Sequence, residues 1–198
     1  RLAERHREAF DIPVVGITGS NGKTVVKEWL YQLLSPEKNV TRSPRSYNSQ
    51  IGVPLSVWNL DERSEVGLFE AGISEPGEME ALQSVIQPTI GVFTCLGDAH
   101  QENFTSYEQK CLEKLKLFKD AKVLVYDMDD ARVVGCVNRS AFKGEYFAWS
   151  RQRRDVPLYI ASVEKREAET VVSYIYKGKE AACSIPFIDE ASLANSVS

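Results

Sequence analysis

Residues 12–34 read IPVVGITGSNGKTVVKEWLYQLL, and this stretch decides the fold. It opens with a β-branched run over residues 12–18, which is typical of a buried strand. A Gly-Ser-Asn-Gly cluster at 19–22 ends that run, and residues 23–34 have the character of a helix. The stretch therefore predicts a strand, a tight turn and a helix in direct succession.

The same order recurs three times further along the chain, each time as an apolar run followed by a helical one. The pairs are 65–72 with 77–86, 89–96 with 106–118, and 122–127 with 129–137. Strands that alternate with helices favour an α/β fold, in which a mostly parallel sheet carries helices on both faces. Residues 1–9 predict one further short helix at the start.

The last third of the chain has a different pattern. After Gly144, four strand-like runs follow one another without helices, at 145–150, 158–164, 170–176 and 180–187. We expect them to form a small antiparallel extension at one edge of the sheet, with a hairpin turn at Lys177-Gly178-Lys179. From Asp189 onward the sequence predicts the beginning of a helix without a stop signal, so we expect a piece cut from a longer polypeptide.

Composition excludes several classes of protein. The 198 residues are 43% hydrophobic and 26% charged with a net charge of −4, which is no footprint for nucleic acid. The four cysteines lie far apart and lack zinc-site spacing, so reduced thiols in a cytoplasm are expected. No apolar run approaches the ~20 residues that span a bilayer. The prediction is a cytoplasmic domain, monomeric in this form, that contacts neither nucleic acid nor membrane.

The turn at 19–22 has the context of a phosphate-binding loop, because it follows a strand and opens a helix. Backbone N–H groups of such a loop cradle phosphates, a lysine reaches the β/γ oxygens, and a threonine hydroxyl can ligate Mg²⁺. The usual G-x-x-x-x-G-K-[ST] spacing fails because Ile17 stands at the first glycine. A Gly-rich turn before an ordinary helix is the alternative. The expected nucleotide-binding residues are Gly19, Ser20, Asn21, Gly22, Lys23 and Thr24.

What remains, T-G-S-N-G-K-T at 18–24, resembles the loop of the Mur ligases and their folylpolyglutamate synthase relatives. Other family-like segments follow in order, at 45–54 (RSYNSQIGVP), 69–78 (FEAG with PGE), 97–104 (GDAH with Phe104) and 114–118 (KLKLF). The match is closest to the branch that adds D-alanyl-D-alanine, in a form that some bacteria fuse to an alanine racemase. Another Mur ligase step or folylpolyglutamate synthase is the alternative within this class, and a nucleotide-driven switch module is the alternative from another.

The resemblance implies that residues 1–198 are the central, ATP-binding domain of a larger ligase, without its N-terminal UDP-sugar domain and its C-terminal domain. Such a ligase phosphorylates a substrate carboxylate with ATP, and an amine then attacks the acyl phosphate to form an amide. The substrates implied are UDP-N-acetylmuramoyl-tripeptide and D-alanyl-D-alanine. Because the other domains are needed for turnover, we expect this piece to bind nucleotide weakly and to be inactive alone.

Two polar residues follow neighbouring predicted strands. Glu70 ends the strand at 65–72, and His100 follows the strand at 89–96. Carboxyl ends of parallel strands form the ligand crevice of open α/β sheets, so both side chains should reach it. Read with the resemblance, Thr24 and Glu70 are expected to hold one Mg²⁺, and His100 a second. A solvated carboxylate and a loop histidine bonded to backbone are the alternatives. His6, on the first helix, is read as structural.

The resemblance marks Lys114 as a lysine that reacts with CO₂ to become a carbamate and a metal ligand. Helical spacing supports an inward position, because Tyr107, Cys111 and Phe118 lie on the same stripe. By the same spacing, Lys110, Lys116 and Lys119 are expected to point outward. A desolvated lysine has a lowered pKa and yields the neutral amine that adds CO₂. A lysine at the edge of the apolar face, with its ammonium in water, is the alternative.

The remaining candidates come mainly from the resemblance. Asn48 and Ser46 match family positions near the γ-phosphate and the incoming carboxylate, although turn chemistry also selects such residues. Asn195 is the one match to the family's adenine-contacting helix start, and a capping role for Ser192 is the alternative there. Asp129 and Asp130 are expected to be structural.

Overall fold

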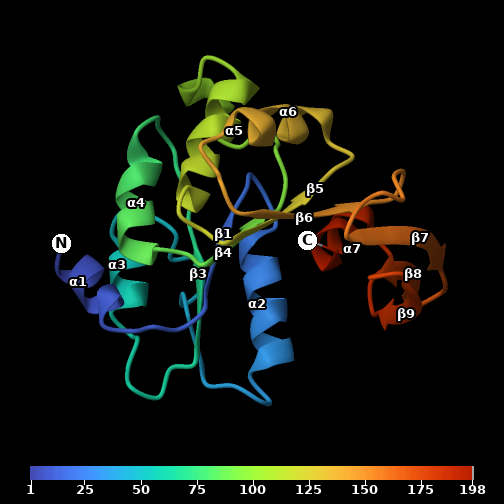
Figure 1. The fold of residues 1–198 in the computed structure, drawn as a ribbon, viewed down its shortest axis with the longest axis horizontal. Helices are drawn as coiled ribbons and strands as arrows, with labels where there is room; N and C mark the ends of the chain where they lie inside the picture. Colours follow the sequence, from blue (N-terminus) through green and yellow to red (C-terminus); the bar gives the residue numbers. More distant parts are fainter. Residues whose placement is uncertain (198) are drawn as a thin grey trace.

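A computed structural model describes residues 1–197 as one nine-stranded sheet with helices packed against it (Figure 1). The strand order is β2-β3-β1-β4-β5-β6-β7-β8-β9. The strands are β1 (Val14–Thr18), β2 (Val40–Arg42), β3 (Val66–Glu70), β4 (Ile90–Phe93), β5 (Val123–Asp127), β6 (Glu145–Ser150), β7 (Leu158–Lys165), β8 (Thr170–Tyr176) and β9 (Lys179–Ile185). The helices are α1 (Leu2–Glu8), α2 (Lys23–Leu34), α3 (Gly52–Val57), α4 (Glu78–Ile86), α5 (Tyr107–Leu115), α6 (Ala131–Arg139) and α7 (Glu190–Ser196), with short 3₁₀ turns at Gln101–Asn103 and Lys116–Phe118.

The sheet separates two apolar layers. On one face, α1, α3, α4, α5 and α6 bury the larger cluster, which includes Phe69, Met79, Phe93 and Phe118. On the other face, α2 packs Val26 onto Val15, Ile17, Leu68 and Val92. Successive residues of β1 alternate between the two layers, because side chains of a strand point to opposite faces. The predicted α/β fold with helices on both faces is confirmed.

The strand order reverses direction around β1. From β1 the chain runs outward through α2 to β2 and back to β3, and only then crosses to β4 on the other side of β1. All of these pairings are parallel. Crossings of this kind leave a crevice at the carboxyl ends of the central strands, where ligands of open α/β sheets bind. The segments that meet there are 18–24, 70–74 and 94–100.

The antiparallel extension exists, but it begins later than the sequence suggested. The strands β6 and β7 belong to the parallel part, since β5 pairs with β6 and β6 with β7 in parallel. Only the pairings of β8 are antiparallel, with β7 on one side and β9 on the other, and the predicted hairpin turn joins β8 to β9. Lys177 and Gly178 both have positive φ, 51° and 74°, as a two-residue hairpin turn requires. From the sequence, the absence of helices between the strand-like runs after Gly144 favoured antiparallel strands. The link between β6 and β7 contains no helix, yet these two strands are parallel, so that sign was misleading here.

The chain's last described element is the helix expected from its sequence. Asp189 caps α7 by accepting a hydrogen bond from the backbone N–H of Ser192 at 2.8 Å. This helix packs Leu193 with Trp149, Ile160 and Val172 of the C-terminal strands. Across residues 1–197, none of the helices combines the length and apolar character that crossing a bilayer requires.

Candidate functional site

The loop between β1 and α2 is shaped by two glycines. Gly19 has a φ of 150°, and a Cβ added there would lie 2.0 Å from the Thr94 hydroxyl oxygen. Gly22 has a φ of 83°, and a Cβ there would lie 2.1 Å from Oδ1 of Asn195. A side chain at Gly19 would collide with Thr94, which follows β4, and one at Gly22 would push aside the Asn195 side chain of α7; both glycines also have a positive φ that other residues rarely adopt. The loop therefore lies closely against its neighbours, as a backbone cradle for phosphate does.

Lys23 and Thr24 begin α2 immediately after this loop. The Lys23 ammonium donates to the carbonyl oxygens of Gly19 at 2.9 Å and Ser20 at 3.3 Å, so it lies over the loop itself. Burial lowers the pKa of Lys23, and the nearby Glu70 carboxylate opposes that shift. The Thr24 hydroxyl donates to Oε2 of Glu70 at 2.9 Å. The lysine and the threonine are thus placed as phosphate and Mg²⁺ ligands require.

Glu70 lies at the end of β3 with no exposed surface, because the surrounding segments close over it. Its second oxygen, Oε1, accepts from the Lys27 ammonium at 3.1 Å. Lys27 is also fully buried and donates further to the carbonyl oxygens of Ser43 and Arg45. Sequence reasoning missed this lysine. Its position four residues after Lys23, on the same side of α2, is the signal that would have found it.

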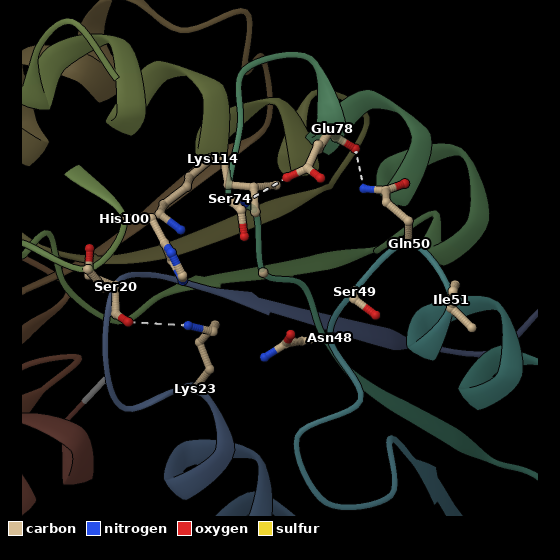
Figure 2. A pocket seen from close by; sticks show the side chains of 13 residues that line it. Ser20, Lys23, Asn48, Ser49, Gln50, Ile51, Ser74, Glu78, His100 and Lys114 are labelled. Atoms are coloured by element: carbon tan, nitrogen blue, oxygen red, sulfur yellow. Dashed lines mark hydrogen bonds between the residues drawn. The ribbon is translucent and has the colours of Figure 1, made fainter. Parts of the chain in front are cut away.

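A cavity of about 300 Å³ opens beside the loop (Figure 2). The side chains of Lys23, His100 and Lys114 point toward the same space, and Asn48 approaches from the opposite side. Glu70 does not line the cavity itself but lies close to it. Its carboxylate accepts from the Thr24 hydroxyl, and Gly72, two residues further along the chain, lines the cavity. The lining residues are Ser20, Lys23, Asn48, Ser49, Gln50, Ile51, Gly72, Ile73, Ser74, Glu78, Ala99, His100 and Lys114.

Lys114 faces inward, as its helical spacing predicted, and only 3% of it is exposed. Burial, together with the nearby ammonium groups of Lys23 and Lys110, lowers its pKa to about 7. At neutral pH the lysine therefore has a large population of neutral amine. Lys116 points outward, with its side chain 40% exposed and paired with Glu113. The contrast between Lys114 and Lys116 agrees with the helical spacing.

The expectation for Lys110 was wrong, because this lysine is fully buried. Its ammonium donates to the carbonyl oxygens of Gly97 and Ala99, at 2.5 Å and 3.2 Å respectively. Helical spacing gives the direction of a side chain but not what folds over it, and here the loop after β4 covers Lys110. The carbonyl oxygens of that loop bind the ammonium, which fixes the segment that leads to His100.

The other ligand candidates occupy different positions around the cavity. His100 is exposed and has a φ of 58°, which turns the chain at the cavity edge. Asn48 packs its side chain against Gly72, and its backbone oxygen accepts from the N–H of Gly72 at 2.8 Å. Ser46 is exposed and does not line the cavity. The side chain of Asn195 lies against Gly22, so α7 reaches the loop.

The donor set fits a Mg²⁺ site that is completed by phosphate oxygens. Among residues 1–197, no three His, Cys, Asp or Glu side chains gather in a way that could hold a metal ion alone. Mg²⁺ in nucleotide sites usually takes only one or two protein oxygens, with phosphate and water as the other ligands. The hydroxyl of Thr24 and the carboxylate of Glu70, 2.9 Å apart beside the loop, match that requirement.

Residues read as structural contact other parts of the fold. Asp130 caps α6 by accepting from the backbone N–H of Arg132 and Val133, at 2.9 Å and 3.5 Å. Asp129, just after β5, accepts from the backbone N–H of Arg151, just after β6, at 2.7 Å, which ties the ends of the two strands together. His6 lies 3.0 Å from the carbonyl oxygen of Leu60 and stacks near Phe10 and Trp58.

A parallel sheet with a glycine loop, a lysine and a threonine at its switch point defines an α/β domain of the phosphate-loop type. The model of the Mur ligase middle domain matches residues 17–198, and the chain belongs to the Mur ligase family. Members of this family use ATP.

Relatives and solved structures of this family agree with this assignment. The chain is 27% identical over its whole length to UDP-N-acetylmuramoyl-tripeptide:D-alanyl-D-alanine ligase of Bacillus subtilis (strain 168), of which it covers 42%. It superposes on 99% of its length with MurF of Thermotoga maritima in complex with ADP, with a TM-score of 0.86 and 26% identity, covering 46% of that chain. MurF of Acinetobacter baumannii gives a TM-score of 0.89 at 20% identity, with 43% of that chain covered. The chain thus spans less than half the length of these relatives.

Proposed function

We propose that this chain is the ATP-binding part of a ligase that joins D-alanyl-D-alanine to UDP-N-acetylmuramoyl-tripeptide, a step in making peptidoglycan precursors. The observation that carries the proposal is one cavity lined by both the Lys23 ammonium of the phosphate loop and the buried Lys114. The similarity to the Bacillus subtilis UDP-N-acetylmuramoyl-tripeptide:D-alanyl-D-alanine ligase supports the choice of substrates.

The chemistry proposed is transfer of the terminal phosphoryl group of ATP to a substrate carboxylate, followed by attack of an amine on the acyl phosphate. The carboxylate oxygen attacks phosphorus and ADP leaves; the amine then attacks the acyl carbon and phosphate leaves. Residues of the domain act mainly by positioning and by neutralising charge. Lys23 holds β/γ oxygens, and backbone N–H groups of residues 21–24 hold the phosphates, whereas the N–H of Ser20 donates to the carbonyl oxygen of Cys95 at 2.8 Å. Mg²⁺, when bound at Thr24 and Glu70, neutralises phosphate charge.

Lys114 is proposed to act as a carbamate. The ammonium first loses a proton to solvent; the neutral amine nitrogen then attacks the carbon of CO₂ and loses a second proton to solvent, so that overall an anion replaces a cation. Burial beside Lys23 and Lys110, which lowers the pKa of Lys114 to about 7, favours the neutral amine. With His100 and Glu70, the carbamate would be the third ligand of a second Mg²⁺, which an ammonium would repel.

Two asparagines complete the proposed site. Asn48 lies at the cavity wall opposite Lys114, where it can hydrogen-bond the γ-phosphate or the incoming carboxylate. Asn195, next to Gly22, is proposed to contact the nucleotide on the side of α7. Both roles follow the family resemblance, and the distances around Gly72 and Gly22 support their placement.

Residues 1–198 are proposed to be the central domain of a three-domain enzyme, with a UDP-sugar domain before it and a second ligase domain after it. The extra length of the relatives supports this division. We place the enzyme in the cytoplasm, where UDP-linked precursors and ATP are found, and expect this domain alone to be monomeric, without nucleic acid or membrane contacts. The fused racemase implied by the resemblance stays a prediction.

A nucleotide-driven switch module is the alternative from another class. It would hydrolyse ATP without either ligase substrate and would have no use for a buried lysine opposite the phosphate loop. Another Mur ligase step or folylpolyglutamate synthase would require a different acceptor amine. The test therefore measures ADP release by the complete enzyme with each substrate omitted in turn.

The proposal predicts continuous ADP release only when UDP-N-acetylmuramoyl-tripeptide and D-alanyl-D-alanine are both present, because without the amine the reaction stops after one ADP at the acyl phosphate. Lys23→Ala and Thr24→Ala in the complete enzyme should abolish turnover and leave the circular dichroism spectrum unchanged. The 198-residue chain alone should release no ADP in response to the two substrates. Substrate-independent hydrolysis, or near-normal turnover by Lys23→Ala at saturating ATP, would refute the proposal.

A further inference from the structure

Lys27 is a buried charged group to which the proposed reaction assigns no role. Its side chain has no exposed surface, although it lies only one helical turn after Lys23. The ammonium donates to the carbonyl oxygen of Ser43 at 2.8 Å, to that of Arg45, and to Oε1 of Glu70 at 3.1 Å. A lysine ammonium has three protons, so these three acceptors satisfy it completely.

The pairing supplies a countercharge where Glu70 needs one. A carboxylate without exposed surface is costly to bury unless a cation and hydrogen bonds compensate it. The Lys23 ammonium donates to the carbonyl oxygens of its own loop, so it does not pair directly with this carboxylate. Lys27 makes the ion pair instead, and Glu28 approaches the same ammonium at 3.2 Å.

The pairing also fixes the direction of the Glu70 carboxylate. Oε1 accepts from Lys27 and Oε2 accepts from the Thr24 hydroxyl, so each oxygen has its own partner. The last torsion of a glutamate side chain is broad when nothing holds it. With Oε1 held by Lys27, Oε2 stays beside Thr24, at the position where the phosphate loop would present Mg²⁺.

The same ammonium connects the three segments that form the site. Lys27 lies on α2, its carbonyl acceptors lie at the end of β2 and in the loop that follows, and Glu70 ends β3. That loop continues to Asn48, whose backbone oxygen accepts from the N–H of Gly72 at 2.8 Å. Movement of Lys27 would therefore disturb the metal-binding carboxylate and the opposite cavity wall together.

We propose that Lys27 is a positioning residue that holds the Glu70 carboxylate toward the divalent cation beside Thr24 and thereby makes nucleotide binding depend on Mg²⁺. This inference rests on the proposed function, because it assumes that Thr24 and Glu70 bind the nucleotide's metal ion. A purely structural ion pair would change the stability of the fold but not the ratio of ADP affinities with and without Mg²⁺.

The experiment is a double-mutant cycle on that ratio. Calorimetry measures the dissociation constant of ADP twice for each protein, once in excess EDTA and once in excess Mg²⁺. The proteins are wild type, Lys27→Met, Glu70→Gln and the double variant. Lys38→Met is the matched control, because Lys38 makes a lysine–carboxylate pair with Glu65 at 3.0 Å that is exposed and remote from the loop. Thermal unfolding of each variant reports folding separately. If Lys27→Met does not fold, Lys27→Gln takes its place.

We expect Mg²⁺ to tighten ADP binding to wild type and to Lys38→Met equally. Lys27→Met should lose roughly tenfold or more of that tightening, as removal of a partner that orients a metal ligand does. Glu70→Gln should abolish the tightening, and adding Lys27→Met to it should change the ratio by less than about twofold, because Lys27 acts through Glu70.

Full Mg²⁺ tightening in Lys27→Met, or in Lys27→Gln where that variant is used, would overturn the inference alone. A further large loss in the double variant would overturn it also, since Lys27 would then act independently of Glu70. A wild-type chain whose ADP affinity ignores Mg²⁺ would overturn both this role and the proposed metal site.

Discussion

Replacing Lys114 with methionine should stabilise the chain at neutral and acidic pH. Methionine has a similar length without the charge, so the substitution removes the cost of burying an ammonium group. The pKa of this lysine falls from 10.5 to about 7 in the folded protein. At ~1.4 kcal/mol per pH unit, that fall corresponds to on the order of 5 kcal/mol. This value is an upper limit, because the buried site relaxes around the charge.

The sign of the pH dependence follows from proton binding. Below pH 7 the lysine is protonated in the folded and the unfolded states, so wild type bears the full cost. Between pH 7 and 10.5 the unfolded state binds the extra proton, and the stability of wild type rises with pH. The advantage of Lys114→Met should therefore shrink by roughly 3 kcal/mol between pH 7 and 9.5.

Urea unfolding of both chains from pH 6 to 9.5, in buffers freed of CO₂, measures this difference. Lys116→Met is the control, because the pKa of Lys116 is raised by its pairing with Glu113. Because that pKa lies above the value in the unfolded chain, Lys116 is protonated in both states from pH 6 to 9.5. Its contribution to the free energy of unfolding is therefore constant, and the control should show no trend with pH. A difference between Lys114→Met and wild type that is flat or grows with pH would refute the reasoning.

Three further predictions test the site and the fold around it. In the complete enzyme, Lys114→Ala should lose most activity and regain part of it with added formate or acetate, whereas Lys116→Ala should change turnover little; equal losses would argue against the carbamate. Gly22→Ala should weaken ADP binding by calorimetry, because its φ is 83° and the new Cβ would lie 2.1 Å from Oδ1 of Asn195; unchanged affinity would contradict the loop geometry. Asp130→Ala should lower the free energy of unfolding by about 1 kcal/mol in urea with no change in ADP affinity, as loss of a helix N-cap does.

The parts of the fold that depend on local patterns could be predicted from the sequence. The strand, glycine turn and helix at 12–34 appear as β1, the loop and α2, because each signal is contained within a few residues. The carboxyl ends of parallel strands meet at one edge of the sheet. The sequence alone therefore placed Glu70 and the segment before His100 near the loop at 19–24.

The features that depend on tertiary contacts could not be predicted. Lys110 and Lys27 are both fully buried, although lysine is usually exposed, because carbonyl oxygens of distant loops bind their ammonium groups. No local pattern reports which loop closes over a side chain. The direction of β7 could not be predicted for a similar reason. Its parallel pairing with β6 depends on the path of the link at 151–157, which carries no local signal.

Binding of ATP to this chain in the presence of Mg²⁺ tests most directly whether the loop at 19–24 is a nucleotide site. The comparison is between wild type, Lys23→Ala and the exposed-lysine control Lys38→Ala. We predict that wild type and the control bind ATP alike and that ADP competes with it. Lys23→Ala should bind ATP roughly 10- to 100-fold more weakly, because it loses one charge-assisted hydrogen bond to the phosphates. Wild-type affinity in Lys23→Ala, or no ATP binding by the wild-type chain at millimolar concentration, would contradict the account.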